Sequence, residues 1–295
     1  MSDAWLAVLP LILLVLAGLV PSRHEPDSAF LAKQQWRYRD VIIVCAILTA
    51  RQWAPLPFLS TASGMRLFAL SYGVTAFVII ASVWGVVRWQ HPRPWRTLGF
   101  DPTTAPYSLL WSLRIGLGLV SVAAVFMVML VLSSPDIDNR AAATRRLAWQ
   151  GQVGDYIAAV LVNTLFMPLA EELFFRGLSY APLSRKFGMA GATVGTAVFW
   201  AVLHYSDSTY ISLTRMSVLF VIGIVYAEVY RRRQSLVPTV VFHSLSNTIS
   251  MFKDERYLGP LLTLAGVSVA LWIMSAALFC VVNRSRKSVR VAESI

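Results

Sequence analysis

The chain has 295 residues, of which 57% are hydrophobic and 14% are charged, and its formal net charge is +11. A soluble domain carries about a quarter charged residues, so this composition argues against a soluble globular protein and indicates one that lies in a membrane. The basic residues form short groups between apolar runs and do not cluster on one element, which argues against a nucleic-acid-binding surface. Cys45 and Cys280 lie in separate apolar runs and predict neither a disulfide framework nor a metal site.

Apolar runs long enough to cross a bilayer recur along the whole sequence. A span needs about 20 mostly apolar residues, so we expect an all-α, polytopic transmembrane helical bundle with about nine spans, eight being the alternative count. The first run has no basic segment before it and no small-residue cleavage site, so we interpret it as a retained span and not as a signal peptide. The expected spans are residues 4–21, 40–58, 66–88, 106–132, 155–182, 188–206, 211–230, 236–252 and 259–282.

The basic residues between these spans predict how the bundle is oriented. With nine spans, sixteen Lys and Arg residues fall on the side that holds the C-terminus and eight fall on the opposite side. Because Lys and Arg resist translocation, we expect the C-terminus to be cytoplasmic. The expected location is the inner membrane of a bacterial cell.

The polar segment from Ser133 to Gly154 divides the chain into regions of different character. Residues 1–149 form an N-terminal transmembrane region of unknown role. In residues 150–252, polar side chains recur inside spans, where lipid exposure would be costly, so we expect this region to be the functional core. Residues 253–295 contribute the last span and a basic cytoplasmic tail.

The fifth span contains two adjacent carboxylates and an arginine, Glu171, Glu172 and Arg176, in an apolar setting. Residues four apart share one helix face, so Glu172 can pair with Arg176 while Glu171 points elsewhere. An unpaired carboxylate in an apolar site takes up a proton more readily than one in water, which suits a general base. We therefore expect Glu171 to be the chemically active group and the pair to be structural support, although a purely structural ion-pair cluster would have the same spacing. Pro168 removes the helical donor of the Thr164 carbonyl, so the helix should bend just before the acids.

Two later spans place histidines inside the same region. His204 ends the sixth span, where a histidine can also be a simple interfacial residue. In the eighth span, His243 and Asn247 are four apart and can both donate to a single point. Two convergent donors suit the oxyanion that forms when a carbonyl is attacked, although a polar seam between helices would look alike.

Taken together, these motifs resemble the CAAX protease and bacteriocin-processing family, which includes the type II CAAX prenyl endopeptidases. The family's signature is E-E-x-x-x-R, then F-x-x-x-H, then H-x-x-x-N or its aspartate variant, and the first and third motifs are present in full. In the second motif, Trp200 stands four residues before His204 in place of phenylalanine. The resemblance covers about residues 150–252.

The resemblance implies an intramembrane glutamate-type endopeptidase that hydrolyses peptide bonds with an activated water. Carried over, Glu171 and His204 would hold and deprotonate the water, while His243 and Asn247 would stabilise the oxyanion. No cofactor and no metal would be needed. The substrate would be a membrane-associated peptide or protein tail reached from the lipid bilayer, and no nucleic acid would be bound.

Counting residues raises a difficulty for this site. A straight sixth helix beginning at Gly188 would place His204 about 24 Å from the cytoplasmic end of its span, whereas Glu171 would lie about 16 Å from that end. The two residues can therefore meet only if the sixth helix begins deeper, if the fifth is bent by Pro168, or if the orientation is inverted.

Three other functions remain compatible with the sequence. The buried Glu and His residues could form a proton or ion relay in a transporter or channel. The chain could also be a non-catalytic relative that binds a partner or confers immunity. Within the enzyme class, Glu171, His204 and His243 could ligate zinc in a metalloprotease, although no H-E-x-x-H motif is present.

Overall fold

The computed structural model describes residues 28–53, 64–101, 103–133, 153–204 and 209–251, together with positions 15, 16, 19, 21, 24, 266, 267, 269–275 and 277. Within these residues every regular element is helical, which confirms the expected all-α class. The expected spans 4–21 and 259–282 lie largely outside the described residues. The elements are α2 (Ala29–Ala32), α3 (Tyr38–Trp53), α4 (Gly64–Gln90), α5 (Pro94–Leu98), α6 (Ala105–Ser133), α8 (Val153–Leu161), η2 (Val162–Phe166), α9 (Met167–Glu172), η3 (Leu173–Ser179), α10 (Tyr180–Val202), α11 (Thr209–Arg233) and α12 (Val237–Met251).

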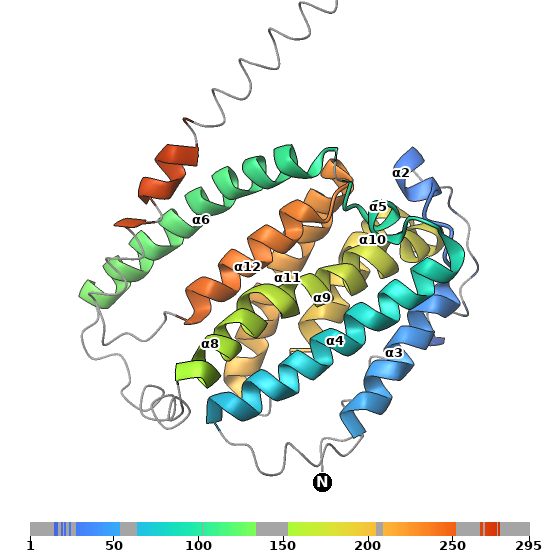
Figure 1. Ribbon diagram of the computed structural model, residues 1–295, viewed down its shortest axis with the longest axis horizontal. Helices are drawn as coiled ribbons and strands as arrows, with labels where there is room; N and C mark the ends of the chain where they lie inside the picture. The colour runs from blue at the N-terminus through green and yellow to red at the C-terminus, as the bar shows by residue number, and fades with distance from the viewer. Residues whose placement is uncertain are drawn as a thin grey trace, which may run out of the picture.

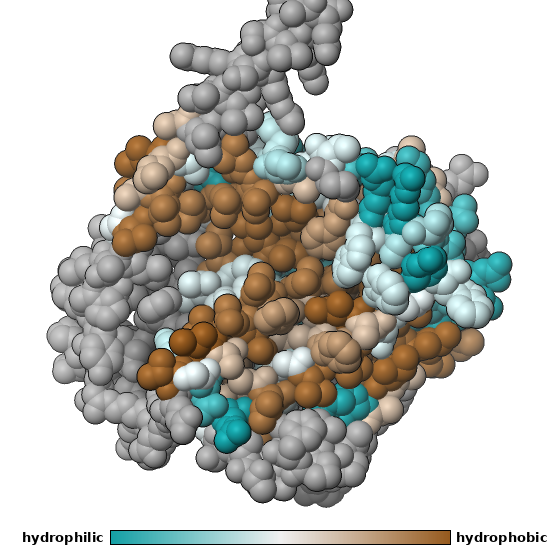
Figure 2. Space-filling view, in the orientation of Figure 1, coloured by the Kyte–Doolittle hydropathy of each residue, from teal (hydrophilic) through white to brown (hydrophobic). Residues whose placement is uncertain are grey.

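Two helical runs of the described chain, Gly64–Gln90 and Val153–Val202, are long and apolar enough to cross a membrane. Hydrophobic residues cover much of the face shown in Figure 2, and hydrophilic residues gather at the end where α2 and α5 lie. The larger number of spans stays a prediction from the sequence.

The long helices pack side by side in one bundle (Figure 1). Helix α12 lies between α6 and the run formed by α8, η2 and α9, and α4 packs on the other side of that run. Helix α3 packs against α4, while α11 contacts both α10 and α12. The run from α8 to η3 is therefore central, with neighbours from both halves of the sequence.

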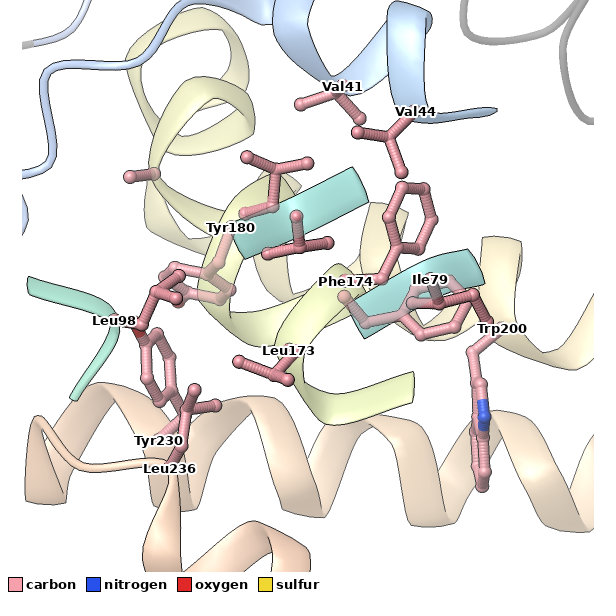
Figure 3. Close-up of a cluster of buried hydrophobic side chains, with 14 of the residues drawn as sticks. Val41, Val44, Ile79, Leu98, Leu173, Phe174, Tyr180, Trp200, Tyr230 and Leu236 are labelled. Carbon is pink, nitrogen blue, oxygen red and sulfur yellow. The ribbon is translucent and has the colours of Figure 1, made fainter. Parts of the chain in front are cut away.

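The hydrophobic core also joins the two halves of the chain. Figure 3 shows Val41 of α3 and Ile79 of α4 gathered with Leu173 and Phe174 of η3. The indole of Trp36 reinforces this contact by donating a hydrogen bond to the carbonyl of Leu178 at 2.7 Å. The N-terminal region thus supports the helix that carries the expected acids.

The run Val153–Val202 is divided at Gly188, whose φ of 70° and ψ of 179° are not helical. Positive φ values are readily reached only by glycine. The chain folds back here, because the rings of Phe174 and Phe199, one on each side of Gly188, are in contact at 5.9 Å between centroids. Gly188 therefore separates the fifth and sixth helical segments.

Candidate active site

The helix that carries the expected acids is irregular on both sides of them. Short π-helical turns, η2 and η3, flank α9. In η2 the N–H of Met167 bonds the carbonyl of Val162, five residues earlier. The next bond in this register would need an N–H on residue 168, but that residue is proline. The carbonyl of Asn163 therefore lacks its helical donor. The sequence analysis, which assumed α-helical spacing, expected the carbonyl of Thr164 to lack one instead.

The side chain of Asn247 supplies the donor that Pro168 lacks. Its Nδ2 donates to the carbonyl oxygen of Asn163 at 2.9 Å. A buried carbonyl without a partner is costly, so this bond stabilises the π-helical turn just before the acids. The structure thus gives Asn247 a task that the sequence analysis did not identify.

Glu172 and Arg176 form the ion pair that their spacing predicts. Arg176 Nη1 lies 2.9 Å from Glu172 Oε1, and both side chains are completely buried. A second N–H of the guanidinium donates to the carbonyl of Gly223 on α11 at 3.0 Å. The same Glu172 oxygen lies 3.0 Å from Nδ1 of His243 on α12. This buried network ties together the acid-bearing helix, α11 and α12.

Glu171 points away from that pair and toward two imidazoles. Its Oε2 lies 4.0 Å from His204 Nε2 and 3.8 Å from His243 Nε2. The same oxygen accepts a hydrogen bond of 2.5 Å from the indole Nε1–H of Trp200. The Glu171 side chain is 12% exposed, so the carboxylate is mostly but not fully enclosed. Three of the four expected catalytic residues therefore meet at one carboxylate oxygen.

The hydrogen bonds of the two histidines assign their ring nitrogens. His204 Nδ1 lies 2.8 Å from the carbonyl oxygen of Trp200, which can only accept, so Nδ1 is the protonated nitrogen. His243 Nδ1 faces a Glu172 carboxylate that is also paired with Arg176, so it too donates. When either ring is neutral, its Nε2 therefore presents a lone pair toward Glu171.

The difference in depth that residue counting suggested does not exist. Glu171 stands 17 residues before Gly188, and His204 stands 16 residues after it. Because the chain folds back at Gly188, two arms of nearly equal length bring these residues to the same level. The sequence-based estimate was wrong because it ended the fifth span at residue 182, whereas the helix continues to Gly188.

The motifs that the sequence analysis singled out therefore lie around one site in the structure. Residues 153–249 match the family model described as "Type II CAAX prenyl endopeptidase Rce1-like". The expected resemblance is confirmed for this segment. No curated protein and no solved structure matches the chain.

The Rce1-like segment begins at α8, ends within α12 and contains all the candidate site residues. The family consists of membrane proteins, in keeping with the two long apolar helical runs. It is also a protease family, so the match supports peptide hydrolysis as the class of reaction.

Two residues of the site were not among the candidates from the sequence. Trp200 was noted there only as an aromatic replacement, but its indole bonds Glu171. Tyr226 of α11 is buried beside His243, with 5.6 Å between ring centroids, and the Arg176 guanidinium lies 5.5 Å from its ring. An indole at a position where the family has phenylalanine was the one available signal for Trp200.

Proposed function

We propose that this protein is an intramembrane glutamate-type endopeptidase in which Glu171 activates a water molecule. The observation that carries the proposal is the approach of two imidazole nitrogens, from His204 and His243, to a single oxygen of Glu171. The acid and the two histidines come from three helical segments and converge inside the bundle. Ionisable groups buried in this way are costly and mark functional sites.

The distances suit a water molecule between Glu171 and the histidines. At 4.0 Å and 3.8 Å, Nε2 of His204 and Nε2 of His243 are too far from Oε2 for a direct hydrogen bond. A water oxygen placed to one side can lie about 2.8 Å from both a carboxylate oxygen and an imidazole nitrogen. Such a water can donate one proton to Glu171 and the other to the Nε2 lone pair of His204.

Hydrolysis then follows general acid–base chemistry. Glu171 takes one proton as the water oxygen attacks the scissile carbonyl carbon, and the carbonyl π bond opens to an oxyanion. When the tetrahedral intermediate collapses, the C–N bond breaks and protonated Glu171 returns the proton to the leaving amine. The products are a carboxylic acid, which keeps the second proton of the water, and an amine, and no cofactor is consumed.

The oxyanion would be stabilised from α12. Because His243 donates from Nδ1 to Glu172, it can donate to the oxyanion from Nε2 as well only when both ring nitrogens carry a proton. We propose that Asn247, one turn later, contributes to the same oxyanion site.

The proposed substrates are membrane-associated peptides or protein tails. The family description supports a tail carrying a prenyl group, because a lipid anchor would hold the cleavage site at the bilayer. We further propose a multi-pass protein of the bacterial inner membrane with a cytoplasmic C-terminus, as the distribution of basic residues predicts.

A comparison of membrane proteomes tests the proposal. Cells that carry the Glu171→Gln variant should accumulate uncut forms of proteins that wild-type cells process. Glu228→Gln is the matched control, because Glu228 lies in α11 and pairs with Arg231 and Arg232. Identical processing in wild-type and Glu171→Gln cells would sink the glutamate mechanism.

The same variant separates the protease from the alternative functions. In a transporter or channel, Glu171→Gln would abolish ion coupling in vesicles and no peptide would be cut by either protein. In a non-catalytic immunity or binding relative, the variant would alter neither processing nor ion flux.

A further inference from the structure

Trp200 contacts three of the four proposed catalytic residues. Its Nε1–H donates to Glu171 Oε2 at 2.5 Å, and its backbone carbonyl accepts from His204 Nδ1 at 2.8 Å. Its ring packs edge-on against His204 and His243, with centroid distances of 5.1 Å and 5.3 Å. One residue therefore touches the acid and both imidazoles.

The surroundings of Trp200 fix the indole in place. The residue is only 2% exposed, and Figure 3 shows it at the edge of the hydrophobic core. The Arg176 guanidinium lies 5.6 Å from its ring, and Tyr226 packs against it at 5.9 Å between centroids. A side chain at Gly223 would place its Cβ 3.3 Å from Trp200 Cε3, so the glycine leaves room for the larger ring. The indole thus fits a site shaped to hold it in one orientation.

The bond from Trp200 matters because Glu171 has few other restraints. Among the described residues, Trp200 is the one side chain that donates a hydrogen bond to Glu171, since both imidazoles lie beyond hydrogen-bond distance. Phenylalanine, which the family motif has at this position, would pack similarly but has no donor. In this chain the carboxylate would then be free to turn about its side-chain torsions.

We propose that Trp200 is a positioning residue that holds Glu171 in its reactive orientation through the indole N–H. The proposal deepens the proposed function and depends on Glu171 being the general base. Small misplacements of a catalytic group can lower the rate about a hundredfold, so one well-placed donor is enough to matter.

The bond itself is tested by NMR, without any need for activity. The full chain is labelled with ¹⁵N at the indole nitrogens of its ten tryptophans and placed in lipid nanodiscs. Trp200→Phe identifies the Trp200 signal by its loss. Glu171→Gln should shift that signal more than any other indole signal, while the control Glu228→Gln should leave it in place. An unmoved Trp200 signal in Glu171→Gln would overturn the proposal.

The consequence for catalysis is tested by removing the N–H alone. Site-specific replacement of Trp200 by benzothienylalanine keeps the ring shape and substitutes sulfur for the N–H group. With a quenched fluorescent farnesylated peptide as the probe, kcat should fall about tenfold, as the loss of one charge-assisted hydrogen bond predicts, while KM stays unchanged. Trp200→Phe should show the same kcat if it folds, which its melting temperature establishes.

The outcomes separate this proposal from the proposed function. If Glu171→Gln cuts the peptide as fast as wild type, Glu171 is not the base and the proposed function fails, whatever the NMR shows. If Glu171→Gln is inactive but the benzothienylalanine chain keeps full kcat, Trp200 is not a positioning residue. A wild-type chain that does not cut the prenylated peptide contradicts the proposed substrate and leaves the NMR result to decide the bond.

Discussion

Asn247 donates a hydrogen bond from its side-chain amide to the backbone carbonyl of Asn163, 84 positions earlier in the chain, at 2.9 Å. That carbonyl belongs to the π-helical turn η2 and would accept from residue 168 in the same register, if residue 168 were not proline. The last helix of the site therefore completes the backbone of the helix that carries the acids. A residue expected to act on the oxyanion also maintains the local path of the chain.

This relationship predicts that Asn247 and Pro168 are energetically coupled. Asn247→Ala should lower the free energy of unfolding by about 1–3 kcal/mol, because the Asn163 carbonyl loses its donor. In a Pro168→Ala background the restored backbone N–H can bond Asn163, so the same change should cost clearly less. A double-mutant cycle on unfolding in mixed micelles measures the difference.

Asn247→Asp is the matched variant for this cycle. Aspartate is close to asparagine in shape, but an ionised carboxylate cannot donate a hydrogen bond to a carbonyl. The Asn247→Asp variant should therefore be no more stable than Asn247→Ala. Equal costs of Asn247→Ala in the two backgrounds would show that the amide does not replace the proline's missing donor.

The sequence was informative wherever local geometry decides the outcome. The spacing of Glu172 and Arg176 predicts their pairing, and it also predicts that Glu171 points elsewhere, because both follow from the helical repeat. The histidines could be associated with these acids only through the family resemblance, since no local rule brings separate helices together.

The end of the fifth span could not be predicted from local pattern. Arg185 and Lys186 look like loop residues, yet the helix continues through them to Gly188. The guanidinium of Arg185 donates hydrogen bonds to the carbonyls of Gln34 and Trp36, at 3.0 Å and 2.5 Å. Contacts between residues about 150 positions apart cannot be recognised from the local composition of the sequence. The direction of the Trp200 indole likewise depends on packing against other helices.

The buried ion pair predicts a large cost for removing one partner. Arg176→Met should lower the free energy of unfolding by about 3–5 kcal/mol, because Glu172 would be left as an unpaired charge in a fully buried site. The double variant Glu172→Gln, Arg176→Met should recover most of this loss, because no charge is then stranded. Thermal unfolding in the same detergent compares the three chains.

An exposed pair on α11 provides the control for this comparison. Arg232 lies 2.5 Å from Glu228, but its side chain is 71% exposed. Arg232→Met should therefore cost less than about 1 kcal/mol. If Arg176→Met is as mild as Arg232→Met, the network around Glu172 does not stabilise the bundle.

Chelators are expected to leave the peptidase activity unchanged. Within the described chain, no group of three or more His, Cys, Asp and Glu side chains has the geometry to hold a metal ion. The Trp200 N–H also points at the Glu171 oxygen that faces both imidazoles, and its positive hydrogen would repel a cation there. Activity of the purified protein is measured before and after dialysis against EDTA and phenanthroline. Loss of activity that zinc restores would favour the metalloprotease interpretation instead.

The close approach of α10 and α11 predicts that a single methyl group at Gly223 harms both stability and activity. A Cβ at this position would lie 3.0 Å from Cα and Cβ of Ala197 and 3.3 Å from Trp200 Cε3. Backbone atoms cannot yield as a flexible side chain can, so the helices must move apart. Gly223→Ala should lower the free energy of unfolding by about 1–3 kcal/mol, as overpacking does elsewhere.

The same movement should disturb the site, because the Gly223 carbonyl accepts from Arg176 and the Gly223 Cα faces Trp200. Gly195→Ala in α10 is the matched control, since a Cβ there meets nothing within 4 Å and alanine is the better helix former. We expect Gly195→Ala to keep the wild-type melting temperature and activity. Gly223→Ala should have a lower melting temperature and a lower activity. If Gly223→Ala keeps its melting temperature but loses turnover, the strain falls on Trp200 alone, and the indole is the part of this contact that the reaction needs.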